Sequence, residues 1–454
     1  MADGPALVVR CHVVAVTHDL SSVLTFPTAA GWFLPYVESN VLPGVLDSVQ
    51  TMLQGWTHTS TIVHTAPLTL GPSLPREAYC VALVETPRPA AAVKAIPLSV
   101  LRNTHPLLPI QREAVVTSLA RLREPRAPFD SIRHVSAALA WAEQQIGELT
   151  GARVLSTSRF RCGRHEYVVG LETTAGPMYF KGGPERVADE ATLTDFLSHL
   201  RPRHFPQTLA IDRANERWLY RALEGESLNG CELTVALIAE AARALASLQK
   251  AVLGDAETRA HLRERCLSAV AMCHRADLQI RRARQGLTME APEVVSAYSK
   301  WDRGMDRILE TCKRLDDLQL PMTLVLSDFW TTNILRTPEG IGFIDVGSSY
   351  WGLPALPLWR FINDVEQRFA GNGARAAIEH AFATEWADLI APSDMHACFS
   401  RLPLLWGLFT ILLVSEEWDL DERALDAAAC TDYRAMRLLP LLRYIRRTLR
   451  AMPS

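Results

Sequence analysis

Hydrophobic and polar positions alternate along the first part of the chain, as they do in half-buried strands. A helix is predicted at 46–54, and a second helical period follows Pro109 at 110–122. Strands are predicted at 7–16, 22–26, 61–64 and 79–85. The Pro-rich stretch 124–128 then interrupts the pattern, so residues 1–128 are predicted to form a first, small α/β domain.

Residues 129–228 combine one helix with a set of strands. A helix capped by Asp130 or Ser131 has its apolar face at Ile132, Val135, Leu139, Ala142 and Ile146, and Gly151 ends it. Strands are predicted at 153–156, 167–173 and 178–181, a helix at 187–199 and a further strand at 217–225. We predict a linker helix followed by a sheet-rich lobe.

From residue 229 to residue 454 the apolar residues recur mainly with helical spacing. The first predicted helix here is amphipathic and covers residues 233–252. Two or three arginine-rich helices are expected at 256–318, and more helices follow residue 376. The apolar run 402–414 is too short to span a bilayer and predicts a buried helix. We expect these residues to form a helical lobe.

Within that lobe, residues 324–347 read LVLSDFWTTNILRTPEGIGFIDVG, a buried strand, a turn and a strand pair. Asp328 lies in the turn, Asn333 follows five residues later, and Asp345 ends the last strand. Carboxylate and amide oxygens are ligands that Mg²⁺ prefers, usually together with phosphate and water. Kinase-type sites have the same order along the chain: an Asp that acts as base, an Asn after four intervening residues, and a later Asp-x-Gly. The Asn and the second Asp bind the metal ion.

This stretch resembles the catalytic loop of the aminoglycoside phosphotransferase and choline kinase-like family, which has His-Gly-Asp, four residues, Asn, then Ile-Asp. Here the His and Gly positions hold Leu326 and Ser327. The resemblance implies an α+β, protein-kinase-like bilobal fold and transfer of a phosphoryl group from ATP or GTP. It makes Asp328 the catalytic base, and Asn333 and Asp345 the Mg²⁺ ligands.

Further positions match the same family. Lys181 ends a strand, where the family lysine meets the nucleotide phosphates, and Glu190 in the next helix would hold it by an ion pair. Glu185 and Asp189 are competing partners. The strand at 217–225 resembles the hinge, which would bind the purine through backbone groups around Tyr220, Ala222 and Leu223.

After Asp345 the family has acidic residues that brace the loop, and this chain lacks them unless Asp364 substitutes. Four aromatic residues could line an acceptor pocket or belong to the core: Trp330, Tyr350, Trp351 and Trp359. The acidic run 416–422 could bind a cationic acceptor, but a solvated helix end is the favoured interpretation.

The first domain resembles a Nudix hydrolase, where Gly-Trp-x-x-Pro precedes a metal-binding helix; residues 31–35 read GWFLP. The Nudix box is absent, because residues 47–54 read DSVQTMLQ. Without its carboxylate cluster little would hold Mg²⁺ against a pyrophosphate. We predict a Nudix-like domain without hydrolase activity, a prediction that release of nucleoside monophosphate from nucleoside diphosphate derivatives would contradict. An unrelated α+β domain is the alternative.

Composition limits the partners. The 454 residues carry a formal net charge of −3 at pH 7, and the isoelectric point is near 6.5, so the chain lacks the basic surface charge typical of nucleic-acid-binding proteins. The nine cysteines form no Cys-x-x-Cys pair, and no secretory signal is apparent, so we expect reduced thiols in a cytoplasmic protein without membrane partners.

The sequence therefore predicts a phosphotransferase that acts on a hydroxyl of a small molecule of the aminoglycoside, sugar or amino-alcohol type. A non-catalytic, nucleotide-binding pseudokinase is the first alternative, favoured by Leu326 and Ser327. A kinase-fold enzyme that transfers AMP is the second. The acceptor, the choice of ATP or GTP and the oligomeric state are left open.

Overall fold

The computed structural model describes most of the chain. It covers residues 9–17, 22–28, 31–39, 42–56, 60–67, 76–84, 93–97, 115–116, 132–162, 167–183, 186–285, 292–369, 373–422 and 427–451. Most of the predicted helix 110–122 lies outside these ranges. The chain divides into two compact units, residues 1–188 with 208–222, and residues 189–207 with 223–454. The predicted domain limits at 128 and 228 stay a prediction.

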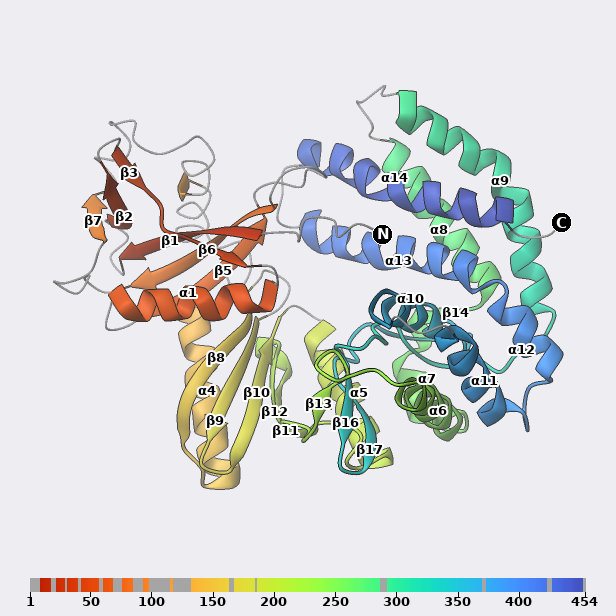
Figure 1. Cartoon of the computed structure of the whole chain (residues 1–454), viewed down its shortest axis with the longest axis horizontal. Helices are drawn as coiled ribbons and strands as arrows, with labels where there is room; N and C mark the ends of the chain where they lie inside the picture. Colours follow the sequence, from red (N-terminus) through yellow and green to blue (C-terminus); the bar gives the residue numbers. More distant parts are fainter. Residues whose placement is uncertain are drawn as a thin grey trace. The chain divides into compact units, whose positions relative to one another are not determined.

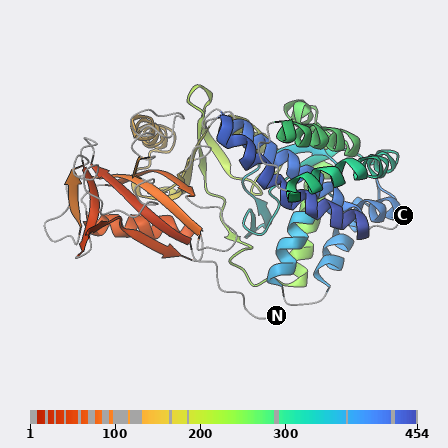
Figure 2. The same cartoon turned by 90° about the horizontal axis from the view of Figure 1, so that it is seen from above.

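The first unit begins with a mixed seven-stranded sheet of order β3-β2-β1-β6-β5, with β4 paired to β1 and β7 to β2 (Figures 1 and 2). Its strands are β1 (Val9–Thr17), β2 (Ser22–Thr28), β3 (Gly31–Phe33), β4 (Tyr36–Ser39), β5 (Ser60–Pro67), β6 (Arg76–Val84) and β7 (Lys94–Pro97). β1 and β6 are parallel, and the continuous apolar run of β1 suits a strand buried on both faces. The predicted helix is α1 (Leu42–Trp56).

A second sheet in this unit has the order β11-β12-β10-β9-β8. Its strands are β8 (Val154–Cys162), β9 (Tyr167–Thr173), β10 (Gly176–Gly182), β11 (Gln207–Asp212) and β12 (Arg217–Arg221). Helix α4 (Ile132–Thr150) contacts β10 and β12 through its predicted apolar face, where Val135, Ala142 and Ile146 are fully buried. Gly151 ends the helix with a positive φ of 68°, a conformation that glycine adopts without strain.

The second unit is mainly helical, as the sequence predicted. Its helices are most of α5 (Arg186–Leu200), α6 (Val235–Val252), α7 (Ala256–His261), α8 (Ala269–Gln285), α9 (Pro292–Asp316), α10 (Leu358–Arg368), α11 (Ala374–Trp386), α12 (Pro392–Phe399), α13 (Leu402–Glu422) and α14 (Ala427–Ala451). α13 lies beside α14 (Figures 1 and 2). The predicted burial of α13 is confirmed, since Leu405, Leu408 and Phe409 are fully buried.

Two small sheets in this unit carry the loop of interest. One has the order β13-β16-β17, and the other β14-β18-β15. Their strands are β13 (Glu226–Ser227), β14 (Cys266–Leu267), β15 (Thr323–Leu326), β16 (Ile334–Thr337), β17 (Gly340–Phe343) and β18 (Ser349–Gly352). Gln249 of α6 is fully buried and donates to the Leu324 carbonyl at 2.8 Å and the Pro354 carbonyl at 2.9 Å. It ties β15 to the core helix.

Among the described helices none is by itself long and apolar enough to cross a membrane. The pair α12 and residues 402–415 of α13, bent by 56°, passes that test only when taken together, by length and composition.

Candidate active site

The loop after β15 holds Asp328 in a closed turn. All four residues of β15 are buried, and its last residue, Leu326, pairs with Ser349 of β18. The Asp328 carbonyl accepts from the backbone N–H of Trp330 at 3.1 Å and from the Asn333 side-chain amide at 3.2 Å. Asn333 is therefore fixed beside Asp328 by its own side chain.

Asp345 is brought to the same place by the β16–β17 hairpin. The backbone N–H of Ile344 donates to the Asn333 carbonyl at 3.0 Å, so Asp345 directly follows a residue that is bonded to Asn333. Asp345 has a φ of 60°, in the left-handed region that Asp tolerates better than most residues. Such outliers gather at functional sites, and this one motivates a binding role for Asp345.

The two departures from the family motif have structural roles. Leu326 belongs to the hydrophobic core of the unit and is 5% exposed. Ser327 is buried, and its hydroxyl donates to the Ser348 carbonyl, three residues after Asp345. The pair anchors the loop by packing and by one hydrogen bond.

Asp364 of α10 braces the loop, as the sequence analysis suggested it could. Its carboxylate accepts from the backbone N–H of Thr331 at 2.9 Å and from the Thr331 hydroxyl. Arg368, one helical turn later, donates to the same hydroxyl at 2.6 Å and to the Asn229 carbonyl at 2.6 Å. The acidic brace of the family is thus replaced by a carboxylate from the following helix.

Arg360 is the residue that the sequence analysis missed. Its guanidinium donates to Asp328 Oδ1 and lies 4.4 Å from the centre of the Trp330 ring, a cation–π contact. Arg360, Asp364 and Arg368 are spaced by four and so share one face of α10. That spacing, in the first helix after the loop, is the sequence signal that could have revealed them.

Glu190 lies against the segment that follows Asp345. It is 5% exposed, and a methyl group added at Gly347 would lie only 2.7 Å from its Oε2. Arg265 donates to the Gly347 carbonyl at 2.9 Å and pairs with Asp189 at 3.6 Å. Asp189, a competing partner for the lysine in the sequence analysis, is therefore paired with Arg265. Arg265, from the stretch predicted to be arginine-rich, thus contacts the segment after Asp345.

The close approach of Glu190 makes Gly347 a sensitive position. We expect Gly347→Ala to lower the free energy of unfolding by about 1–3 kcal/mol, because the added carbon overpacks against a buried carboxylate. Gly254→Ala is the matched control, because nothing lies within 4 Å of its new carbon. Urea denaturation of both variants checks this, and equal effects at the two positions would contradict it.

Lys181 and the predicted hinge lie on adjacent strands of the first unit. Lys181 of β10 is 5% exposed and pairs with Trp218 of β12. Tyr220 stacks on Trp218 at 4.3 Å between ring centres, and the Ala222 backbone N–H donates to the Pro177 carbonyl. Lys181 belongs to one unit and Glu190 to the other, and the ion pair between them stays a prediction.

Leu223 belongs to the second unit and packs against β17. A methyl group at Gly342 would clash with Leu223 Cδ2, so only glycine leaves room for this side chain. Leu223, at the end of the predicted hinge, therefore contacts the hairpin that precedes Asp345.

The other candidates separate into core and surface. Tyr350 and Trp351 are buried in the core, whereas Trp359 is half-buried beneath Arg375. The side chains of the acidic run lie outside the described residues. In the described part of the chain no group of three or more His, Cys, Asp or Glu side chains could hold a metal ion.

Comparisons with known proteins agree with the motif. A family model described as the phosphotransferase enzyme family matches residues 156–391, which contain every predicted site residue. Similar solved structures include a choline kinase from Cryptosporidium parvum Iowa II, with 14% identity, 65% of this chain and 90% of that chain covered, and a TM-score of 0.46.

A choline kinase from Streptococcus pneumoniae shares 16% identity, with 68% and 99% of the two chains covered and a TM-score of 0.43. A macrolide 2′-phosphotransferase from Brachybacterium faecium shares 18% identity, with 64% and 97% covered and a TM-score of 0.41. No curated protein sequence matches the chain closely enough to count as a relative.

Proposed function

The chain belongs to the phosphotransferase enzyme family, and we propose that it transfers the γ-phosphoryl group of ATP or GTP to a hydroxyl of a small molecule. Sugars, aminoglycosides and amino alcohols are the acceptor types that the family resemblance suggests. The observation that carries the proposal is a pair of hydrogen bonds that hold the three residues together. The Asn333 side-chain amide donates to the Asp328 carbonyl, and the Asn333 carbonyl accepts from the backbone N–H of Ile344, the residue before Asp345.

The roles follow from chemistry and position. Asp328 would orient the acceptor hydroxyl and accept its proton. Lys181, aimed by Glu190, would hold the α- and β-phosphates. Backbone groups of Tyr220, Ala222 and Leu223 would hold the purine, and Ala222 would use its carbonyl, because its N–H already donates to Pro177. Catalysis of this kind rests on positioning and charge neutralisation.

Asn333 and Asp345 fit a Mg²⁺ ion. The Asn333 amide nitrogen donates a hydrogen bond to the Asp328 carbonyl. The amide oxygen can therefore face a hard cation. With two protein ligands the ion would complete its shell from phosphate and water, as Mg²⁺ commonly does. When bound, Mg²⁺ would neutralise charge on the phosphates.

A nucleotide-binding protein without catalytic activity is the second candidate, favoured by one observation. Arg360 contacts the very carboxylate that would act as base, and it could keep Asp328 from an acceptor. Transfer of AMP instead of phosphate stays open as a third chemistry, and the mass of the modified acceptor would separate the two transfers.

Thermal stability with nucleotide and Mg²⁺ tests the proposal. Saturation at about 100 times Kd stabilises a protein by about 2.7 kcal/mol. We expect ATP or GTP to raise the Tm of the wild type in the presence of Mg²⁺, and Asp345→Ala to lose the Mg²⁺-dependent part of that rise. A full Mg²⁺-dependent rise in Asp345→Ala would show that the metal assignment is wrong.

For the first domain we keep the Nudix-like interpretation as a proposal without a catalytic role. The described side chains of α1, residues 48–56, include no carboxylate, and Val49 and Leu53 are buried in the core. The helix therefore contributes packing. The seven cysteines whose side chains the structure describes are free, which supports a reducing compartment such as the cytoplasm.

A further inference from the structure

A cavity of about 280 Å³ lies between α9 and α14, on elements that contribute nothing to the catalytic loop. Trp301 and Ile308 of α9 and Ile445 of α14 form part of its apolar lining. Lys300, Arg443 and Arg446 supply its charged lining, and Lys300 donates to the hydroxyl of Ser296, which also lines it. Among the described residues that line it, none is acidic. The cavity thus combines an apolar interior with positive charge.

Several positive charges act on one lysine here. Burial lowers the pKa of Lys300, and the charges of Arg446, Arg303, Arg450 and Arg443 lower it further. Like charges held this close disfavour the protonated lysine, and a bound anion would relieve that repulsion. A second cavity beside the first continues the basic surface along α14, with Arg447 and Arg450 in its lining.

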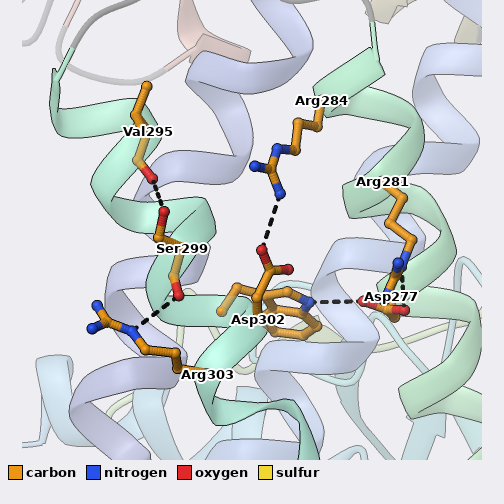
Figure 3. A network of polar contacts seen from close by, with 8 residues as sticks. Asp277, Arg281, Arg284, Val295, Ser299, Asp302 and Arg303 are labelled. Carbon is orange, nitrogen blue, oxygen red and sulfur yellow. Dashed lines mark hydrogen bonds and ion pairs between the residues drawn. The ribbon is translucent and has the colours of Figure 1, made fainter.

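Two nearby carboxylates, Asp302 of α9 and Asp277 of α8, are paired with arginines of α8 (Figure 3). Asp302 accepts from Arg284 at 3.0 Å, and Asp277 accepts from Arg281 at 2.7 Å. The Trp301 indole nitrogen donates to Asp277 at 2.9 Å, which fixes the ring that lines the cavity. Asp277 and Asp302 therefore already have partners among the arginines of α8.

We propose that this cavity, the α9–α14 site, binds a small anionic amphiphile. Its carboxylate or phosphate head would lie among Lys300, Arg443 and Arg446, and its single apolar tail would pack on Trp301 and Ile445. The volume is just below the roughly 300–1,000 Å³ of drug-sized ligand pockets, which suits one short acyl chain. The proposal is independent of the phosphotransfer activity.

Binding of decanoate and decyl phosphate to the full chain tests the proposal, by calorimetry and by Trp fluorescence. We expect saturable binding of both probes below their micelle concentrations. Decyltrimethylammonium has the same tail with a positive head, and acetate and inorganic phosphate have the head alone; each should bind at least tenfold more weakly. Equal binding of the cationic amphiphile would overturn the proposal.

Two variants locate the binding. A methyl group at Gly304 would already lie 3.4 Å from Leu449 Cδ1, so Gly304→Leu should fill the cavity, and leucine also favours the helix. We expect Gly304→Leu and Lys300→Glu/Arg446→Glu each to weaken decanoate binding at least tenfold. Lys313→Glu, an exposed position of α9 outside the lining, is the charge control and should bind like the wild type.

The remaining outcomes are decisive as well. Binding that survives Gly304→Leu would place the probe elsewhere and overturn the assignment. Binding to vesicles of anionic lipid without binding of monomeric decanoate would identify a membrane-surface patch instead of a site for a single amphiphile. Circular dichroism of each variant shows whether a loss of binding reflects loss of the fold. None of these measurements depends on nucleotide turnover.

Discussion

Replacing Asp328 by asparagine is expected to lower kcat for phosphoryl transfer by about 10²–10⁴-fold, the usual contribution of a general base. Asparagine has nearly the same size and can still accept the hydrogen bond from Arg360, but it cannot take the proton of an acceptor hydroxyl. The measurement is release of ADP or GDP at saturating nucleotide with a panel of alcohols. The Mg²⁺-dependent rise in Tm should be kept, because Asp328 is not a proposed metal ligand.

Arg360→Met is the companion variant, since it separates the two candidate functions. If Arg360 positions the base, turnover falls, and Arg360→Lys restores part of it. If Arg360 blocks the base, as the non-catalytic alternative requires, turnover rises when the guanidinium is removed. Turnover of Asp328→Asn within about threefold of the wild type would show that this carboxylate is not a general base.

Asp364→Ala is expected to produce the second large effect, on both stability and activity. It removes the acceptor of two bonds from Thr331, which is itself fully buried, and leaves Arg368 without that neighbouring carboxylate. Hydrogen bonds to charged groups contribute about 1.5–3 kcal/mol each. Because both bonds are only partly buried, we expect a loss below their sum, about 2–4 kcal/mol in the free energy of unfolding. The loop that carries Asp328 would also lose its brace, and kcat should fall by at least about tenfold.

Urea denaturation and initial rates measure these two effects. Glu366→Ala is the matched control, because Glu366 is an exposed carboxylate on the same helix. If both variants behave alike, α10 does not brace the loop through Asp364. If Asp364→Ala loses stability but keeps its kcat, the brace supports the fold alone and the loop keeps its geometry without it.

The local patterns of the chain determined its elements. Hydrophobic period and turn residues predicted α4, α6, β9, β10 and β15, because helices and strands repeat their side-chain directions over a few residues. The order of Asp328, Asn333 and Asp345 along the chain was enough to indicate a phosphotransferase site, since a short loop and a hairpin keep these residues together. The family match over 156–391 agrees with that interpretation.

Contacts between distant residues were decided by the tertiary structure alone. Strand β18 was not predicted, and its pairing with β15 joins residues such as Leu326 and Ser349. Gln249 reaches two carbonyls that lie 75 and 105 residues away in sequence. No local period encodes such partners, because they depend on which surfaces meet when the core closes.

The same reason explains the two features that changed the picture of function. Arg360 reads in sequence as an ordinary arginine of an amphipathic helix, and only the packing of α10 against the loop places its guanidinium on Asp328. Lys300 and Arg446 are separated by most of the second unit in sequence, yet they line one cavity. The sequence by itself therefore determined most of the long elements and the order of the catalytic groups. The tertiary structure decided which charges face one another, because only the folded chain brings them within range.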